Sequence, residues 1–247
     1  MTESPLENPA KNPIGPPKHD KEHFVAPIPL TRIQRLIGER MSKSKQSKPC
    51  FYIESKADVT ELMALRPKLS KSLGVKITTN TFYIRALALA AAKYPLTVGT
   101  LVGDNIKIAD AINVGFAVNT AQGPVVPVIK NADKKQLAEI ARQEKLFTEK
   151  ARSNKLTLAD IEAETIALSN LGAYGIDSFI AIVPLPASTI LAVGNVIKTA
   201  SPQDGDIVVR KMTSLTLAVD RRIINETYAA RFLNFIREQL QNPQQLI

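Results

Sequence analysis

Two adjacent arginines near the C-terminus raise the first question about chemistry in this chain. They lie in the stretch Asp220-Arg-Arg-Ile-Ile-Asn-Glu226, between an apolar run and an amphipathic segment. A guanidinium stays protonated at any physiological pH, so it can bind an anion but cannot accept a proton from a substrate. Proton transfer near neutral pH usually relies on imidazole. This stretch supplies two cations and no base of that kind.

The histidines of the chain lie far from these arginines. There are two, His19 and His23, and both belong to the N-terminal stretch "PPKHDKEHF". Histidine is therefore missing from the expected folded part, unless the N-terminal segment folds back onto it. The single cysteine, Cys50, cannot form an internal disulfide or a multi-thiolate metal site, and we interpret it as a small buried hydrophobe. No metal site is expected.

Composition narrows the class of protein. A hydrophobic content of 45% is enough for a substantial core, and no apolar run approaches the roughly 20 residues that span a bilayer. The net charge of +9 is spread along the chain, and aromatic residues make up only 5%, which argues against a nucleic-acid-binding surface. We expect no membrane and no nucleic-acid partner. The expected location is the cytoplasm, or the mitochondrial matrix if the source is eukaryotic.

The pattern along the chain predicts a tail and one folded domain. Residues 1–28 are rich in Pro, Asn, Lys and Glu, which is typical of a disordered tail or linker. The core domain is expected over residues 29–247. It opens with a helix that Thr31 can cap, apolar on one face and basic on the other. Two interpretations of this helix stay open: packing on the edge of its own domain, or docking on a neighbouring subunit.

The rest of the domain alternates between apolar strands and helices, which favours an α/β fold with a covered mixed sheet. Pro67 should kink or split the second helix, and Asp133 should cap a later one. Helices are expected in 31–48, from 58 or 60, in 81–95, after 133, in 158–164 and from 225. Strands are expected in 50–58, 112–120, 123–131, 165–172, 179–186, 188–198 and 206–219, with a hairpin turning at 103–105.

Four phrases carry a resemblance to a known family. They are "PLTRIQRLIGERMSKSKQSKP", "NVGFAVNTAQGPVVPVIKNADKKQLAEIAR", "LSNLGAYGIDSFIAIVPLPASTILAVG" and "DRRIINETYAARFL". In this order they resemble the catalytic core domain of the dihydrolipoamide acyltransferases of 2-oxo acid dehydrogenase complexes. The resemblance implies a two-layer fold of the chloramphenicol acetyltransferase type and a trimer. It also implies an active site between subunits that carries an acyl group between dihydrolipoamide and coenzyme A.

The closing motif of the family, D-H-R-x-x-D-G, is only partly matched here. Its histidine, the general base that activates the thiol, corresponds to Arg221. Its acidic residue corresponds to Asn225, and its glycine to Glu226. The family serine that stabilises the oxyanion from the neighbouring chain is retained as Ser169. The resemblance therefore implies a degenerate catalytic site in which one candidate oxyanion residue survives.

Other positions differ as well. The paired glycines that often precede the serine strand are Ala163 and Glu164 here, and the threonine two residues before the serine is Ala167. Alternatives remain for the retained groups: the Ser169 hydroxyl could bond to neighbouring backbone. Arg221 could pair with Glu226 or Asp220, or bind coenzyme A phosphates.

We therefore expect a non-catalytic, trimer-forming core subunit of such a complex, able to co-assemble with an active relative. The apolar terminal residues Leu246 and Ile247 match the residues that link trimers into larger cages in the family, although a frayed terminus is the alternative. Two other functions stay open. One is an active acyltransferase with a modified mechanism. The other is a module that binds coenzyme A or dihydrolipoamide at a vestigial channel without turnover.

Overall fold

A computed structural model describes residues 28–121, 123–203 and 205–247 of the chain. Residues Thr31–Ile247 form one compact unit, and Met1–Leu30 are grouped apart from it. His19, His23 and nearly all of the expected tail lie outside the described residues, so the prediction of a disordered tail stays a prediction. The fold below is that of the compact unit.

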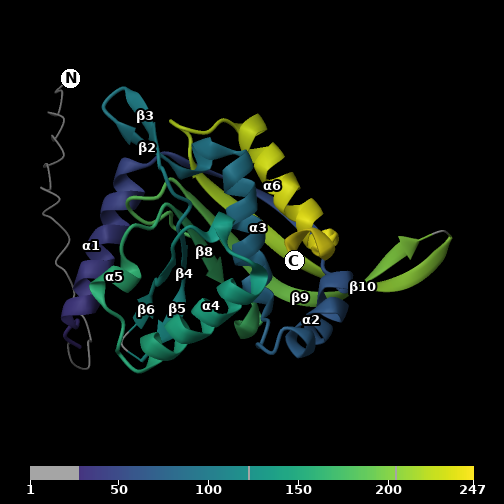
Figure 1. Cartoon of the computed structure of the whole chain (residues 1–247). Helices are drawn as coiled ribbons and strands as arrows, with labels where there is room; N and C mark the ends of the chain where they lie inside the picture. The colour runs from purple at the N-terminus through teal and green to yellow at the C-terminus, as the bar shows by residue number, and fades with distance from the viewer. Residues whose placement is uncertain (1–27, 122, 204) are drawn as a thin grey trace, which may run out of the picture. The chain divides into compact units, whose positions relative to one another are not determined.

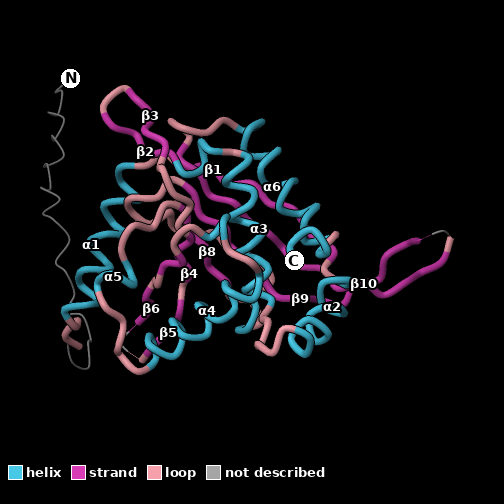
Figure 2. Tube along the Cα trace, in the orientation of Figure 1, coloured by secondary structure: helices cyan, strands magenta, loops and turns pink. Residues whose placement is uncertain are grey.

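A mixed sheet forms the centre of this unit (Figures 1 and 2). Within the described residues its strand order is β1-β10-β9-β8-β4-β7. The pairs β1–β10, β10–β9 and β4–β7 are antiparallel, whereas β9–β8 and β8–β4 are parallel. The strands are β1 Cys50–Asp58, β4 Val114–Phe116, β7 Val128–Ile129, β8 Ile166–Asn170, β9 Thr189–Gln203 and β10 Asp206–Asp220.

Helices cover one face of the sheet and form the main core with it (Figure 1). The most deeply buried is α3, because its sequence is apolar on nearly every side, as predicted. The amphipathic α6 buries Ala229, Phe232, Leu233, Ile236 and Leu240, again as predicted. The covering helices are α2 Thr60–Ser72, α3 Thr79–Lys93, α4 Leu137–Arg152 and α6 Glu226–Gln241.

The opposite face of the sheet carries a smaller apolar cluster under the segment 181–187. Helix α1, Arg32–Ser47, is held to this segment by hydrogen bonds that Arg40, Ser44 and Lys48 donate to backbone carbonyls. Thr31 caps the helix, as predicted. Much of α1 is exposed, and Leu36 on its expected apolar face is 51% exposed. Within one chain, α1 therefore contacts the edge of its own domain, as one of the two interpretations predicted, but it does not bury its whole apolar face there.

Short elements complete the unit. They are α5 Leu158–Ile161, the hairpin of β2 Gly99–Val102 and β3 Asn105–Ile108, and the hairpin of β5 Val118–Thr120 and β6 Gly123–Val125. Short 3₁₀ turns lie at Pro95–Val98, Ala132–Lys134, Gly172–Tyr174 and Pro243–Leu246. The β2–β3 turn falls where the Gly-Asp-Asn sequence predicted it.

Four expectations about local structure were wrong. The predicted strand 179–186 is an irregular segment, because its alternating pattern meets no strand partner among the described residues. The stretches 112–120 and 123–131 each break into two short strands. Asp133 lies in a 3₁₀ turn, and Gln136 is the cap residue of α4. Helix α2 continues through Pro67, so of the predicted kink or split the split was wrong.

Candidate functional site

The loop after β10 is built around an ion pair whose carboxylate is buried and whose Arg222 side chain is 40% exposed. The Asp220 side chain is 1% exposed and accepts hydrogen bonds from Arg222 Nε at 2.9 Å and Nη2 at 2.6 Å. Asp220 also anchors the loop through its backbone, because its amide donates to the Ser188 carbonyl. The carboxylate raises the pKa of Arg222. These two motif residues therefore have a structural role, because together they hold the turn from β10 into α6.

Arg221 points out of this loop toward solvent. Its backbone amide donates to the Pro49 carbonyl at 3.1 Å, and its Nε donates to Glu226 Oε1 at 2.7 Å. Both side chains are at least half exposed. Of the two carboxylates that the sequence offered, Arg221 thus pairs with Glu226 and not with Asp220. The pKa of Glu226 is lowered, first by its own backbone amide and then by the hydrogen bond from Arg221.

Asn225 begins helix α6. Its Oδ1 accepts a hydrogen bond from the Tyr228 amide at 2.9 Å, which is the arrangement of an N-cap residue. Glu226 follows in the first helical turn, where a negative charge is favoured by the helix dipole. The sequence signal for this role was available, since Asn precedes an acidic residue and an amphipathic run. The interpretation of Asn225 as only a lost carboxylate missed the cap.

Ser169 lies near the end of β8 and is half-buried. Its hydroxyl forms no hydrogen bond to any of the described residues, so the interpretation in which neighbouring backbone satisfies it was wrong. The next residue does bond locally, because Asn170 Oδ1 accepts from the Gly172 amide at 2.9 Å. The structure thus leaves the serine hydroxyl available while the adjacent turn is fixed.

One chain does not bring Ser169 and Arg221 together. Ser169 pairs with Ala192 of β9, which pairs with Thr216 of β10, and Arg221 follows Thr216 by five residues. Two strand spacings and five residues along a strand amount to roughly 19 Å. A reaction that needs both positions at once would therefore need a second copy of the chain. This agrees with the between-subunit site that the resemblance implies.

The groups closest to the loop cannot replace a neutral base. Burial raises the pKa of the Cys50 thiol, and the nearby Asp220 carboxylate adds to that rise. Burial lowers the pKa of the Lys48 ammonium, against the attraction of Asp220. Lys48 donates to the Pro184 and Ala187 carbonyls, so it is committed to holding the segment under α1. Cys50 itself is half-buried and not fully enclosed as expected.

Glu164 is a buried carboxyl two residues before the start of β8. It is 6% exposed, and its Oε1 is buried without a hydrogen-bond partner among the described residues. Burial raises its pKa to about 7, although Arg40 and Lys48 oppose that rise. The carboxyl lies over Gly115 of β4, where a Cβ would come within 2.4 Å of Oε1. Glu164 therefore titrates near neutrality but is enclosed by its own chain.

The residue before Glu164 is strained. Ala163 has φ of 68°, a left-handed conformation that glycine adopts without steric cost. Its carbonyl accepts a hydrogen bond from Asn113 Nδ2 at 2.8 Å, which holds the backbone in place. The backbone here therefore has a conformation that favours glycine, although the residue at this position is alanine.

Other site expectations can be placed as well. No three or more His, Cys, Asp or Glu side chains cluster as metal ligands within the part of the chain that the structure describes. None of the described helices is long and apolar enough to cross a bilayer. Leu246 is fully buried in its own chain, and Ile247 is 44% exposed. Of the two terminal residues expected to link trimers, only Ile247 is thus presented at the surface.

Comparisons with known proteins identify the family. Residues 23–247 match the family model of the 2-oxoacid dehydrogenases acyltransferase (catalytic domain). The acetyltransferase component of the pyruvate dehydrogenase complex of Rickettsia prowazekii is 33% identical over 91% of this chain and 56% of its own length. The mitochondrial pyruvate dehydrogenase protein X component of Mus musculus is 32% identical over 89% of this chain and 44% of its own length. The chain spans about half the length of these relatives.

Solved structures agree. The dihydrolipoamide acetyltransferase of Azotobacter vinelandii superposes with a TM-score of 0.87 at 30% identity, covering 95% of this chain and 99% of the other. That structure belongs to an investigation of a serine, a histidine and an asparagine in the catalytic mechanism of that enzyme. A probable acetyltransferase from Listeria monocytogenes gives a TM-score of 0.83 at 33% identity, covering 91% and 95% of the two chains. The predicted two-layer acyltransferase fold is confirmed, and the chain belongs to the family of 2-oxoacid dehydrogenase acyltransferase catalytic domains.

Proposed function

We propose that this chain is a non-catalytic, trimer-forming core subunit of a 2-oxo acid dehydrogenase-type complex. The observation that carries the proposal is the identity and setting of Arg221. A guanidinium occupies the position of the motif histidine, points to solvent and is bonded to Glu226. It cannot take a proton from a thiol at physiological pH. Loss of a positioned general base typically lowers turnover about 10²- to 10⁴-fold.

Spacing supports the assignment of Arg221 to that position. In the Azotobacter enzyme the named histidine follows the named serine by 52 residues, and the asparagine follows the histidine by four. Ser169, Arg221 and Asn225 have the same two spacings. Asn225 thus has the residue type named for that enzyme, and it is not by itself a sign of lost activity. On this comparison the loss falls on the histidine alone.

A second candidate is an active acyltransferase with a modified mechanism. It is favoured by the free hydroxyl of Ser169 and by the match at Asn225, because two of the three named residue types are retained. In this mechanism the thiol would have to react as a thiolate formed in solution or lose its proton to water. Turnover would then rise with pH toward the pKa of the thiol, about 8.5 or above.

An acyl-transfer assay with acetyl coenzyme A and dihydrolipoamide separates the two candidates. We expect wild-type turnover at least about 100-fold below that of a histidine-bearing relative. Arg221→Ala is the matched control, because it removes the guanidinium without adding a base, and it should leave turnover unchanged. Arg221→His should raise turnover above both. The double variant Arg221→His with Glu226→Gly removes the competing carboxylate and should raise it further.

The non-catalytic proposal fails if the wild type turns over at the rate of the relative, or if Arg221→Ala lowers turnover. A lack of rescue by Arg221→His leaves that proposal standing and shows that the channel differs at more than one residue. Equilibrium binding of coenzyme A to the same variants tests whether coenzyme A is bound at a vestigial channel without turnover. The proposed partners are further copies of this chain and an active relative.

The same proposal gives a location. Some relatives are named as mitochondrial components and others are bacterial. We accordingly place the chain in the bacterial cytoplasm or the mitochondrial matrix, as part of a larger complex. Co-purification with the other subunits of a 2-oxo acid dehydrogenase complex, from cells of the source organism, checks both the partner and the compartment.

A further inference from the structure

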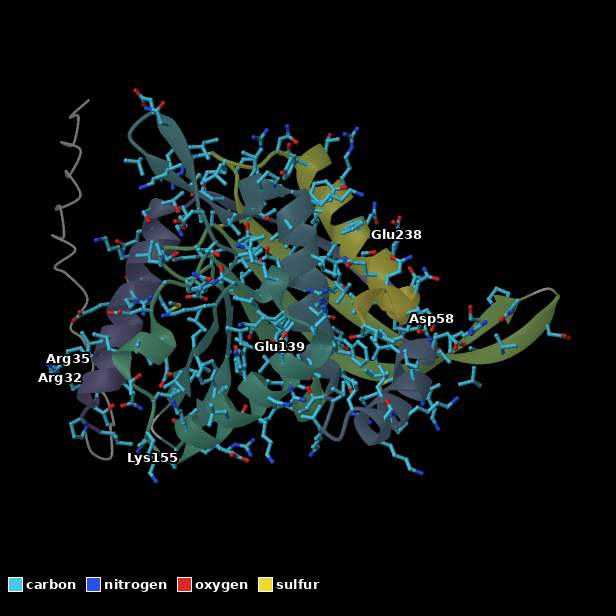
Figure 3. All side chains as sticks on the ribbon, in the orientation of Figure 1. Arg32, Arg35, Asp58, Glu139, Lys155 and Glu238 are labelled. Carbon is cyan, nitrogen blue, oxygen red and sulfur yellow. The ribbon has the colours of Figure 1, made fainter. Side chains whose placement is uncertain are left out.

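The far end of the β9–β10 hairpin extends beyond the rest of the sheet (Figure 1). Strand β1 follows β10 only as far as Asp58 opposite Met212, and β8 follows β9 only as far as Asn170 opposite Val193. Residues 198–203 and 206–211 therefore form strand pairs only with each other among the described residues, and we call them the arm. At its root the Lys211 carbonyl also accepts from the Val59 amide, and the Lys211 amide donates to Thr60 Oγ1. Figure 3 shows Asp58 beside the root of the arm, where it pairs with Arg210 at 3.6 Å.

The arm has one apolar face and one polar face. Directly opposed residues of an antiparallel pair lie on the same face, so Ala200 with Val209 and Pro202 with Ile207 form a continuous apolar patch. Ile207 is 82% exposed and Val209 is 65% exposed. The other face carries polar pairs such as Thr199 with Arg210. An isolated two-stranded hairpin is marginally stable, so aliphatic side chains displayed on one face indicate a surface that is covered in the assembly.

Two lysines border the apolar patch at the root of the arm. Lys198 lies directly opposite Lys211, on the same face as the patch. Like charges in this arrangement repel each other. Neither lysine forms an ion pair with any residue that the structure describes. A partner that covers the aliphatic patch and also brings a carboxylate to the lysines would satisfy both features.

Such a surface exists elsewhere on the same chain. The segment 176–182 follows β8 and displays Ile176, Ile180 and Ile182 at 40%, 62% and 42% exposure. Asp177 is exposed in the same segment and has no ion pair with the described residues. Inside the chain this segment is fixed, since the Asn195 amide donates to the Ile176 carbonyl at 2.7 Å. The segment 176–182 is thus an apolar surface with one carboxylate that has no ion pair among the described residues, and its backbone is fixed by a hydrogen bond to the sheet.

The two surfaces also match in spacing. Along the arm, Lys211, Val209 and Ile207 follow at two-residue steps, so the charge lies about 7 and 13 Å from the two aliphatic side chains. Along the segment, Ile180 and Ile182 follow Asp177 by three and five residues, which limits the separations to about 10 and 17 Å. Each surface therefore carries a charge followed by two aliphatic groups over a similar length, and the charges are opposite.

We propose that the arm of one copy of this chain docks on the segment 176–182 of a second copy, with Asp177 between Lys198 and Lys211 and the isoleucines against Ile207 and Val209. The two surfaces differ, so the contact is head-to-tail and can repeat around a closed ring. This inference rests on the assembly part of the proposed function and names the residues that make one of its contacts. It does not depend on whether acyl transfer occurs.

Charge reversal on the full chain tests the docking, with the mass of the particle measured by sedimentation over a concentration series. Lys198→Glu with Lys211→Glu should weaken association at least about 10-fold, and so should Asp177→Lys alone. The triple variant that carries all three changes should regain most of the loss. Ile207→Asp, which places a charge in the apolar patch, should weaken association about 100-fold.

The matched control is Lys134→Glu with Lys155→Glu, which makes the same change of net charge at two exposed lysines outside the arm (Figure 3 labels Lys155). This control should assemble as the wild type does, and circular dichroism melting should show that each variant is folded. The docking proposal is overturned if the arm variants assemble normally, if the triple variant is not rescued, or if the control is weakened equally. A wild type that is monomeric at every concentration overturns the trimer proposal as well, while the acyl-transfer result stands separately.

Discussion

The loop after β10 and the pair Ala163-Glu164 just before β8 both depart from the pattern that the family resemblance implies, but the fold accommodates them differently. At the loop, Arg221 is turned to solvent and bonded to an exposed Glu226. Before β8, Ala163 has a positive φ, and Glu164 is buried with an oxygen that lacks a partner among the described residues. The first departure removes a chemical group at the surface. The second strains the backbone at Ala163 and places an ionisable carboxyl, that of Glu164, in the interior.

This difference teaches how chemistry and stability can change separately. In the solvent-facing part of a loop, a catalytic residue can be replaced by a residue of another type with little effect on folding, because solvent screens the new charge. A residue at the base of a strand has fixed neighbours, so a changed side chain acts on the free energy of unfolding. We therefore expect stability measurements to separate the two regions, from a large effect at Glu164 to a very small one at Arg221.

The largest effect is expected for Glu164→Gln, as a function of pH. In the folded chain this carboxyl has a pKa of about 7, against 4.5 as its ordinary value, so the folded state retains the proton that the unfolded state releases. Stability from this group is present below pH 4.5 and is lost as pH rises to 7. The variant should be about 2–3 kcal/mol more stable than wild type at pH 8, with little difference at pH 4.

Urea unfolding of both proteins across that pH range measures the effect. The Arg40 and Lys48 side chains both favour the charged form of Glu164, so they act against the rise in its pKa and do not cause it. Glu162→Gln is a matched control, because this neighbouring carboxyl is exposed. A pH-independent difference between Glu164→Gln and wild type would show that Glu164 is ionised throughout, and our account of its burial would be wrong.

The next effect is expected for Ala163→Gly. Glycine removes the steric cost of a positive φ, about 1–2 kcal/mol, and adds some freedom to the unfolded chain. The variant should be about 0.5–1 kcal/mol more stable in thermal or urea unfolding. Ala64→Gly, at an exposed position of helix α2, is the control with the opposite sign, since glycine in a helix interior destabilises. If both variants are destabilised, the backbone at Ala163 is not strained.

A similar magnitude with the opposite sign is expected at the start of α6. Asn225→Ala removes the hydrogen bond to the Tyr228 amide and should cost about 1 kcal/mol of stability. Asn225→Asp keeps the acceptor and adds a charge that the helix dipole favours, so it should be as stable as wild type or more so. A large loss with Asp would contradict the capping role and point to the nearby Asp220 carboxylate instead.

The smallest effect is expected for Arg221→Gln. The ion pair with Glu226 is exposed on both sides, and such pairs contribute little. The change in unfolding free energy should be close to the error of the measurement, and raising the salt concentration should shrink it further, because salt screens an exposed pair. The comparison at Arg222 is informative: Arg222→Gln leaves Asp220 buried without its cation and should destabilise the fold clearly more. Equal effects at the two arginines would remove the contrast between them.

Much of the fold could be predicted from periodicity. The helices α1, α3 and α6 and the strands β1, β9 and β10 have strong amphipathic or apolar patterns, which are local properties. The errors fall where tertiary contacts decide. The segment 179–186 has the alternation of a strand, yet Ala181 and Val183 turn inward against the sheet while Ile180 and Ile182 face outward with no partner strand among the described residues. A pattern cannot show whether a neighbouring strand is present.

The candidate site divides in the same way. The serine, the arginine and the asparagine could be located in the sequence, because a motif depends on residue type and order. Their roles could not, because the Asn225 cap and the choice of Glu226 as partner depend on backbone geometry. The burial of Glu164 over Gly115 of β4, with Arg40 of α1 acting on its charge, also depends on segments far apart in the chain, which residue order alone does not bring together.

By itself, the sequence determined that the expected folded part contains no histidine and that a guanidinium stands in the motif, since both follow from composition and order alone. Only the tertiary structure decided that Arg221 faces solvent, that Ser169 is roughly 19 Å away in the same chain, and that the arm displays an apolar face. The physical reason is that residue type fixes which protons a side chain can exchange. Burial, strand register and contacts between distant segments fix where that side chain can act.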